Sequence, residues 1–199
     1  MAKSTNRKRI CKIYLFRHGQ TYHNRDAMFS GWLDNELTKT GIEHAKIIAL
    51  RLKNKKIDVA FQSRLKRSKQ TLNEVLKYHK ECKKIITDDR IIERNYGVLQ
   101  GKKHYDFVRE NSPELYDKYH RSYDIAPPKG ESIKMVEKRV LSFIKDLLKY
   151  VKKNNVNVAV SAHGNSMRPF RRYFEKWTIQ HMMEMEMPYD ACFEYSVTA

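Results

Sequence analysis

The chain has 199 residues, 41% of them hydrophobic, and its 40 Lys and Arg outnumber 23 Asp and Glu to give a net charge of +17. This length suits one domain with a full hydrophobic core, and the hydrophobic content excludes an intrinsically disordered chain. The basic residues are scattered and no zinc-finger or RNA-recognition spacing accompanies them, so we expect small phosphorylated ligands rather than nucleic acid.

The first half of the chain predicts strands that alternate with helices. Residues 1–9 are polar and are expected to form a flexible N-terminus, whereas residues 10–199 are expected to form a single domain. β-Branched and aromatic side chains in residues 10–16 predict a buried strand. Hydrophobic periodicity then predicts a helix from near Thr38 to Leu52 and a strand at residues 57–61. A second helix is predicted at residues 64–79 and a short strand at residues 85–87.

The second half continues the same alternation. Residues 88–101 are charged and are interpreted as an ordered functional loop. Residues 102–123 predict a helix in two pieces, because Ser112 suits a cap and Pro113 suits the first position of a helix. A long amphipathic helix is predicted at residues 131–153, followed by a buried strand at 156–162 and a helix at 163–176. One or two helical turns at 178–187 and a final strand at 191–197 complete the chain. This order indicates an α/β fold, a three-layer sandwich with a mostly parallel central sheet flanked by helices.

The cysteines and the N-terminal residues bear on the cellular compartment. Cys11, Cys82 and Cys192 are odd in number and widely spaced, so neither a disulfide framework nor a metal-binding spacing follows. The hydrophobic stretch near the N-terminus is short and lacks a cleavage site of small residues, and no stretch approaches membrane-spanning length. We therefore expect a cytoplasmic protein that does not bind membranes.

Two of the predicted strands end in similar polar segments. The first is followed by Arg17-His18-Gly19, and the strand at 156–162 is followed by His163. Either histidine alone fits an ordinary surface residue, but parallel neighbours bring both to one edge of the sheet. Arg67 follows a third strand end, and Asn165 opens a helix whose N-terminus favours anions. Together these residues predict a phosphate-binding site.

On these motifs the chain resembles the histidine phosphatase superfamily, and within it the cofactor-dependent phosphoglycerate mutases. The resemblance covers nearly the whole chain. Its segments lie in the family's order at residues 17–19, 24, 30–32, 63–71, 93–97, 121–124, 130–132 and 162–166. The first segment alone implies only the superfamily, whereas the segments at 93–97, 121–124 and 162–166 indicate the mutase branch.

The resemblance also implies roles for individual residues. His18 is implied as the nucleophile that carries a phosphoryl group, and Glu93 as the general acid and base. The groups that bind the phosphoryl oxygens are implied to be Arg17, Arg67 and His163. The implied substrate-binding residues are Asn24, Ser30, Gly31, Arg94, Tyr96, His104, His120, Arg121, Gly164 and Asn165. The family uses 2,3-bisphosphoglycerate as a primer and needs no metal.

The sequence departs from the mutases at two positions. Mutases carry a second arginine before Arg121 and a lysine eight residues after Tyr96, where this chain has His120 and His104. A neutral histidine weakens carboxylate binding by the worth of one charge-assisted hydrogen bond, ~1.5–3 kcal/mol. The main hypothesis is a mutase that interconverts 3- and 2-phosphoglycerate, and the alternative is a phosphatase of small phosphorylated metabolites. A non-catalytic basic protein that binds nucleic acid or an acidic partner is a third possibility, and both a monomer and a homodimer stay open.

Overall fold

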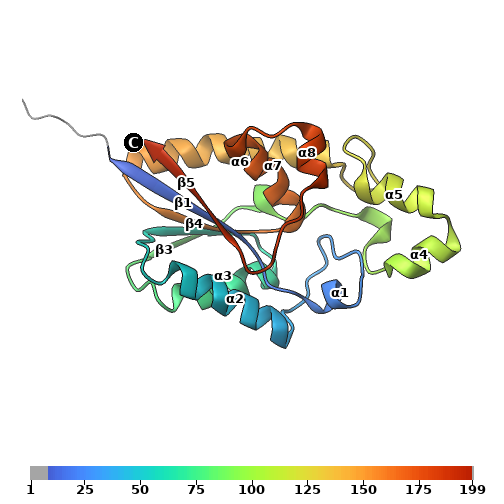
Figure 1. Cartoon of the computed structure of the whole chain (residues 1–199), viewed down its shortest axis with the longest axis horizontal. Coiled ribbons are helices and arrows are strands. Elements are labelled where there is room, and N and C mark those ends of the chain that lie inside the picture. Colours follow the sequence, from blue (N-terminus) through green and yellow to red (C-terminus); the bar gives the residue numbers. More distant parts are fainter. Residues whose placement is uncertain (1–8, 199) are drawn as a thin grey trace, which may run out of the picture.

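The computed structural model describes residues 9–198, and a five-stranded sheet forms its centre (Figure 1). The strands are β1 (Ile10–Arg17), β2 (Val59–Gln62), β3 (Lys84–Thr87), β4 (Val158–Ala162) and β5 (Cys192–Thr198). They lie in the order β3-β2-β4-β1-β5, and β5 runs antiparallel to β1 while the other neighbours are parallel. The predicted α/β fold is confirmed. The segment 1–9 lies outside the described residues except for Arg9.

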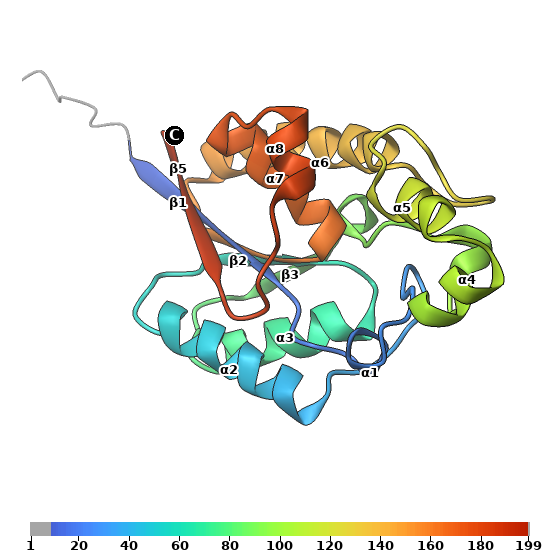
Figure 2. The same cartoon turned by 45° about the vertical axis from the view of Figure 1, so that its right-hand side comes forward.

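Helices cover both faces of the sheet, as expected from the alternation of side chains along β1. Ile13 and Leu15 point to one face and pack on α6 (Ile133–Asn154) and α7 (Gly164–Glu175). Tyr14 and Phe16 point to the other face, where they pack with Ile48 and Leu72 of α2 (Lys39–Leu52) and α3 (Lys66–Leu76). Figures 1 and 2 show helices on both faces of the sheet. The packed side chains therefore form one hydrophobic core on each side of it.

The remaining helices are short. In Figure 2, α1 (Tyr22–Arg25), α4 (His104–Glu110) and α5 (Pro113–Arg121) lie beyond the carboxyl ends of the parallel strands. The segment from 88 to 101 holds two 3₁₀ turns, Asp89–Ile91 and Gly97–Leu99. The last helix, α8 (Ile179–Glu184), packs against α7. Among the described residues, no helix combines the length and hydropathy that crossing a membrane requires.

The cap predicted at Ser112 agrees with the structure, whereas several element boundaries differ from the predicted ones by one to three residues. Thr38 and Ser112 cap α2 and α5 through their hydroxyl oxygens, and Pro113 occupies the first turn of α5. The predicted strand at 57–61 begins at Val59, because the buried Ile57 donates its N–H to the Glu81 carboxylate instead of to the sheet. The predicted helix at 64–79 is shorter and spans Lys66–Leu76.

Candidate active site

The site begins where β1 and β4 end side by side. The register pairs Arg17 with Ala162, so the next residues, His18 and His163, leave the sheet together. The His18 N–H donates to the Ala162 carbonyl at 3.1 Å, which continues the ladder by one bond. The two imidazole rings lie 5.0 Å apart between centroids. The predicted juxtaposition of the two histidines is therefore present.

A close approach of two glycines fixes the chain just after His18. A Cβ atom on Gly19 would lie 2.0 Å from the Gly41 carbonyl oxygen, so only glycine lets this loop rest on the start of α2. The Gly19 N–H donates to the Thr71 hydroxyl on α3 at 3.0 Å. Both contacts hold the backbone that orients the His18 ring.

His18 is buried, and its ring has one defined protonation pattern. Its Nδ1 lies 2.8 Å from the Gly19 carbonyl oxygen, which can only accept, so Nδ1 carries the hydrogen and Nε2 keeps a lone pair. Burial, followed by the charges of Arg67 and Arg17, holds the pKa of His18 well below its usual value. A neutral imidazole with a free Nε2 lone pair is the nucleophilic form of histidine.

His163 is oriented by a residue from a third strand end. Its Nε2 lies 2.7 Å from the hydroxyl of Ser63, which directly follows β2. Its Nδ1 is buried and has no hydrogen-bond partner among the described residues. Burial and the neighbouring Arg67 hold the pKa of His163 well below its usual value. Because buried polar atoms are normally paired, the Nδ1 atom indicates a ligand.

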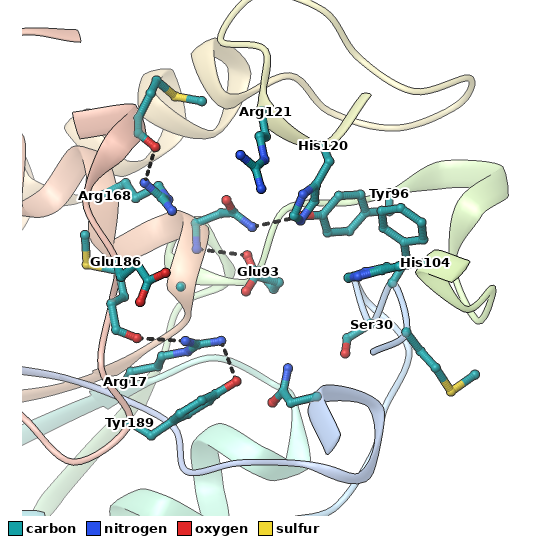
Figure 3. Close-up of a pocket in the computed structure, with 18 of the residues that line it drawn as sticks. Arg17, Ser30, Glu93, Tyr96, His104, His120, Arg121, Arg168, Glu186 and Tyr189 are labelled. Atoms are coloured by element: carbon teal, nitrogen blue, oxygen red, sulfur yellow. Dashed lines mark hydrogen bonds between the residues drawn. The ribbon is translucent and has the colours of Figure 1, made fainter. Parts of the chain in front are cut away.

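Two arginines place positive charge beside the histidines. Arg67 is completely buried, and its guanidinium donates to the carbonyls of Gly31 and Leu33 at 2.7 and 3.0 Å. Burial lowers the pKa of Arg67 to about 10, so the side chain stays charged at neutral pH. Arg17 stacks on the Tyr189 ring at 3.9 Å and donates to the Tyr189 hydroxyl (Figure 3). Both cations favour an anion at this position.

Glu93 brings a carboxylate to the same place. It is buried, and its Oε1 accepts from the N–H groups of Arg94 and Asn165 at 2.7 and 3.2 Å. The N-terminal turn of α7, predicted to favour anions, therefore binds this carboxylate of the chain itself (Figure 3). One ligand atom each from His18, Glu93 and His163 lie within 4.8 Å of one another. This spacing also suits a metal ion, although Arg17 and Arg67 oppose a dication there.

A cavity of about 700 Å³ opens beside these groups (Figure 3). Glu93, predicted as the general acid and base, lines it. Most of the residues predicted to bind substrate or phosphoryl oxygens line it too, namely Arg17, Asn24, Ser30, Gly31, Tyr96, His104, His120, Arg121, Gly164 and Asn165. Four predicted site residues are buried and are not among the lining residues, namely His18, Arg67, Arg94 and His163. The Arg94 side chain is completely buried behind the wall and donates to the carbonyls of Glu131, His120 and Ile125.

Several lining residues were not found from the sequence. They are Met28, Phe29, Arg168, Met183, Glu184, Glu186, Met187 and Tyr189. Arg168 follows Asn165 by three residues on α7, and this helical spacing is a signal that could have identified it. The segment 183–189 has no periodic pattern, and only the fold shows that it returns to the cavity.

Comparisons with known proteins agree with this geometry. The family model described as "Histidine phosphatase superfamily (branch 1)" matches residues 13–198. Phosphoglycerate mutase of Schizosaccharomyces pombe is 36% identical over 179 residues, which cover 88% of this chain and 84% of the relative. A 2,3-bisphosphoglycerate-dependent phosphoglycerate mutase of Parvibaculum lavamentivorans is 34% identical over 93% of this chain and 90% of its own length.

Solved structures share the fold at lower sequence identity. Phosphoglycerate mutase from Bacillus anthracis superposes with a TM-score of 0.78 at 23% identity, covering 96% of this chain and 89% of its own. A mycobacterial glucosyl-3-phosphoglycerate phosphatase superposes with a TM-score of 0.80 at 22% identity, covering 94% and 91%. Mutases and phosphatases thus share this architecture, and the fold alone does not separate the two activities.

Proposed function

This chain belongs to the histidine phosphatase superfamily, and from that premise we propose that it is a 2,3-bisphosphoglycerate-dependent phosphoglycerate mutase acting through a phosphohistidine on His18. The observation that carries the proposal is the group of His18, His163 and Glu93 beside a cavity lined by Arg17. Relatives named as mutases, 30–36% identical over most of the chain, support the choice of reaction.

The first step is attack by His18 on a phosphoryl group. The ring is neutral, and its Nδ1–H bond to Gly19 directs the Nε2 lone pair away from the backbone. Charge that accumulates on the phosphoryl oxygens is stabilised by Arg17, Arg67 and the Nδ1 atom of His163. To donate a hydrogen bond to a phosphoryl oxygen, Nδ1 of His163 must carry the hydrogen. Nε2 of His163 then accepts the hydroxyl hydrogen of Ser63.

Glu93 is the group that exchanges protons with the oxygen of the ester. In its protonated form it donates to the departing oxygen, and as carboxylate it accepts the proton of the attacking hydroxyl. The two backbone N–H groups from Arg94 and Asn165 bind Oε1 and leave Oε2 without a protein donor at these distances. Oε2 is therefore the oxygen available for proton exchange.

The cavity fits an organic bisphosphate such as the primer. Arg121 and Arg168 line it in addition to Arg17, and the Ser30 hydroxyl is buried without a partner among the described residues. When bound, the bisphosphate supplies the phosphoryl group that charges His18. Arg121 is suited to the carboxylate of the substrate, because cations are its usual partners.

The decisive assay supplies 3-phosphoglycerate with 2,3-bisphosphoglycerate and measures both 2-phosphoglycerate and free phosphate. A mutase forms 2-phosphoglycerate much faster than phosphate. We expect His18→Ala to abolish acid-labile phosphate labelling and both activities, while His181→Ala, at an exposed histidine outside the cavity, retains them. Release of phosphate faster than isomerisation would reject the mutase proposal, and labelling that persists in His18→Ala would reject the nucleophile.

One observation favours a phosphatase as the second candidate. Burial lowers the pKa of His120 to about 4 and lowers that of His104, so both are neutral at physiological pH. Two neutral side chains hold a substrate with two anionic groups, a carboxylate and a phosphate, less firmly, which gives water more access to the phosphohistidine. We expect His120→Arg to raise the ratio of isomerisation to hydrolysis by roughly tenfold or more, the worth of one charge-assisted hydrogen bond. An unchanged ratio would show that the histidine does not control this balance.

A further inference from the structure

The cavity has two chemically different sides. Arg17 and Arg168 lie on one side, with Glu93 between the two sides, and the rings of Tyr96, His104 and His120 gather on the other (Figure 3). The charged side accounts for the phosphoryl group. The mechanism above assigns no catalytic step to the ring side and gives its neutral histidines only weak binding of the substrate.

The ring side is a packed cluster built from separate parts of the chain. The Phe29 ring lies 4.3 Å from His104 and 5.0 Å from Tyr96, between centroids. His104 and His120 lie 5.3 Å apart, and His120 lies 4.9 Å from Tyr116. We call Phe29, Tyr96, His104 and His120, which line the cavity, the ring wall; Tyr116 packs against it and is not a lining residue. Contacts at these distances hold the rings in place, so the wall is already formed without ligand.

The ring wall is uncharged but has hydrogen-bonding capacity. Burial is the main cause that lowers the pKa of both histidines, so neither is a cation at neutral pH. The Nδ1 atom of His120 and the hydroxyl of Ser30 are buried and have no partner among the described residues, and both residues line the cavity. Such atoms are normally paired, so they indicate a ligand with a neutral polar group.

The cavity volume also exceeds what a phosphoglycerate needs. Even at ~30 Å³ per non-hydrogen atom, the share of a water molecule in the liquid, its about eleven such atoms take up less than half of the 700 Å³, and the about fifteen of the bisphosphate primer take up roughly two thirds. The lining includes the apolar side chains of Phe29 and Met28 as well as the two histidines. A larger organic group therefore fits.

We propose that the ring wall binds the organic part of aromatic phosphomonoesters, so that the enzyme also hydrolyses phosphate esters of planar, uncharged alcohols. This activity rests on the phosphohistidine of the proposed function. Stacking on the rings holds the planar group, and Ser30 and His120 bond to its polar atoms.

The chemistry needs only water as second reactant. Nε2 of His18 attacks phosphorus, the bond from phosphorus to the ester oxygen breaks, and that oxygen takes the proton of Glu93 and leaves as the alcohol. Water then attacks phosphorus and gives a proton to Glu93, and the electron pair of the P–N bond returns to Nε2. The products are the alcohol and inorganic phosphate, and both side chains regain their starting states.

The test compares two substrates with similar leaving groups, benzyl phosphate and cyclohexylmethyl phosphate. Both release a primary alcohol of similar size, and only the first has an aromatic face. Release of inorganic phosphate by the wild-type enzyme should show a kcat/KM roughly 3- to 10-fold higher for benzyl phosphate, the worth of one aromatic contact. Equal values, or a preference for the saturated ring, would overturn the inference.

A double variant and a surface control link the preference to the ring wall. His104→Lys with His120→Arg places two cations in the wall and should bring the ratio of the two kcat/KM values close to one. The control Tyr105→Ala changes an aromatic residue of α4, next to His104. The Tyr105 side chain is 73% exposed and lies outside the cavity, so this variant should leave the ratio unchanged. A double variant that keeps the wild-type ratio would place the preference elsewhere and overturn the inference.

Labelling separates this inference from the proposed function. If 2,3-bisphosphoglycerate phosphorylates His18 but wild-type enzyme shows no aromatic preference, only the inference fails. If neither bisphosphoglycerate nor benzyl phosphate labels His18, the proposed function and the inference fail together. Labelling by both, with the aromatic preference, supports the two.

Discussion

The neutrality of His120 can be tested through the pH dependence of stability. Its pKa is about 4 in the folded protein, because of burial first and then the positive charge of neighbours including Arg94 and Arg121. In the unfolded chain a histidine titrates near 6.5. Between these two values the unfolded chain binds a proton that the folded protein does not, so stability falls as the pH falls. Above pH 6.5 both states are neutral and the effect vanishes.

The magnitude follows from the size of this shift. Each pH unit in the window contributes about 1.4 kcal/mol, so His120 removes about 2 kcal/mol of stability between pH 6.5 and 5. In the variant His120→Gln the side chain at position 120 does not titrate. Its free energy of unfolding should therefore fall by about 2 kcal/mol less than that of the wild type between pH 6.5 and 5. Urea unfolding of both proteins at several pH values between 7.5 and 5 measures the difference, since the other titrating groups are shared. Curves that stay parallel would mean that His120 is charged or exposed, and the ring wall would then be cationic.

Three further substitutions separate roles that the geometry assigns. Ser63→Ala removes the hydroxyl that sets the His163 tautomer, so it should lower kcat/KM by about tenfold or more and weaken inhibition by inorganic phosphate. Unchanged inhibition by phosphate would exclude a role of Ser63 in positioning His163. Glu93→Gln should lower kcat/KM, which reports the transfer of the phosphoryl group to His18, by roughly 10²–10⁴-fold for benzyl phosphate and much less for p-nitrophenyl phosphate, whose leaving oxygen needs no proton; equal losses in kcat/KM would contradict the acid role. Arg94→Met leaves three carbonyl oxygens without their donor and should lower the free energy of unfolding by about 3 kcal/mol or more in urea; a smaller loss together with a large rise in KM would indicate a direct binding role instead.

The central features of the site could be predicted because strand ends are visible in the sequence. The hydrophobic stretches that end at Arg17 and Ala162 indicate parallel strands, and parallel strands bring the residues that follow to one edge. The sequence alone therefore predicts that His18 and His163 lie close together. The long helix at 133–154 was equally clear, because its hydrophobic stripe serves only packing.

What the sequence did not reveal depends on contacts to backbone carbonyls. Arg94 and Arg67 are completely buried, although an arginine in a charged segment of a sequence is usually predicted to be exposed. Their partners are carbonyl oxygens, which every residue carries, so no sequence pattern identifies them. Tyr189 reaches the cavity through an irregular segment after α8, and it stacks on Arg17 only because the chain folds back there.

These carbonyl contacts explain part of the net charge of +17 and connect it to the chemistry. Loops around the cavity leave carbonyl oxygens without partners, and a guanidinium offers several donors to satisfy them. Arg139 donates to the carbonyls of Arg90, Ile92 and Glu93, Arg168 to those of Met182 and Met183, and Arg17 to that of Met187.

The cations that hold the loops also act on the reacting groups. Arg67 and Arg17 lower the pKa of His18, and Arg67 and Arg139 lower that of His163. The same charge attracts phosphate, so fixing the loops, keeping the proposed nucleophile His18 neutral and binding the proposed substrate would all use one set of arginines. Replacing Arg67 with a neutral residue should therefore alter all three at once, whereas a change in the ring wall should alter only which organic group is accepted.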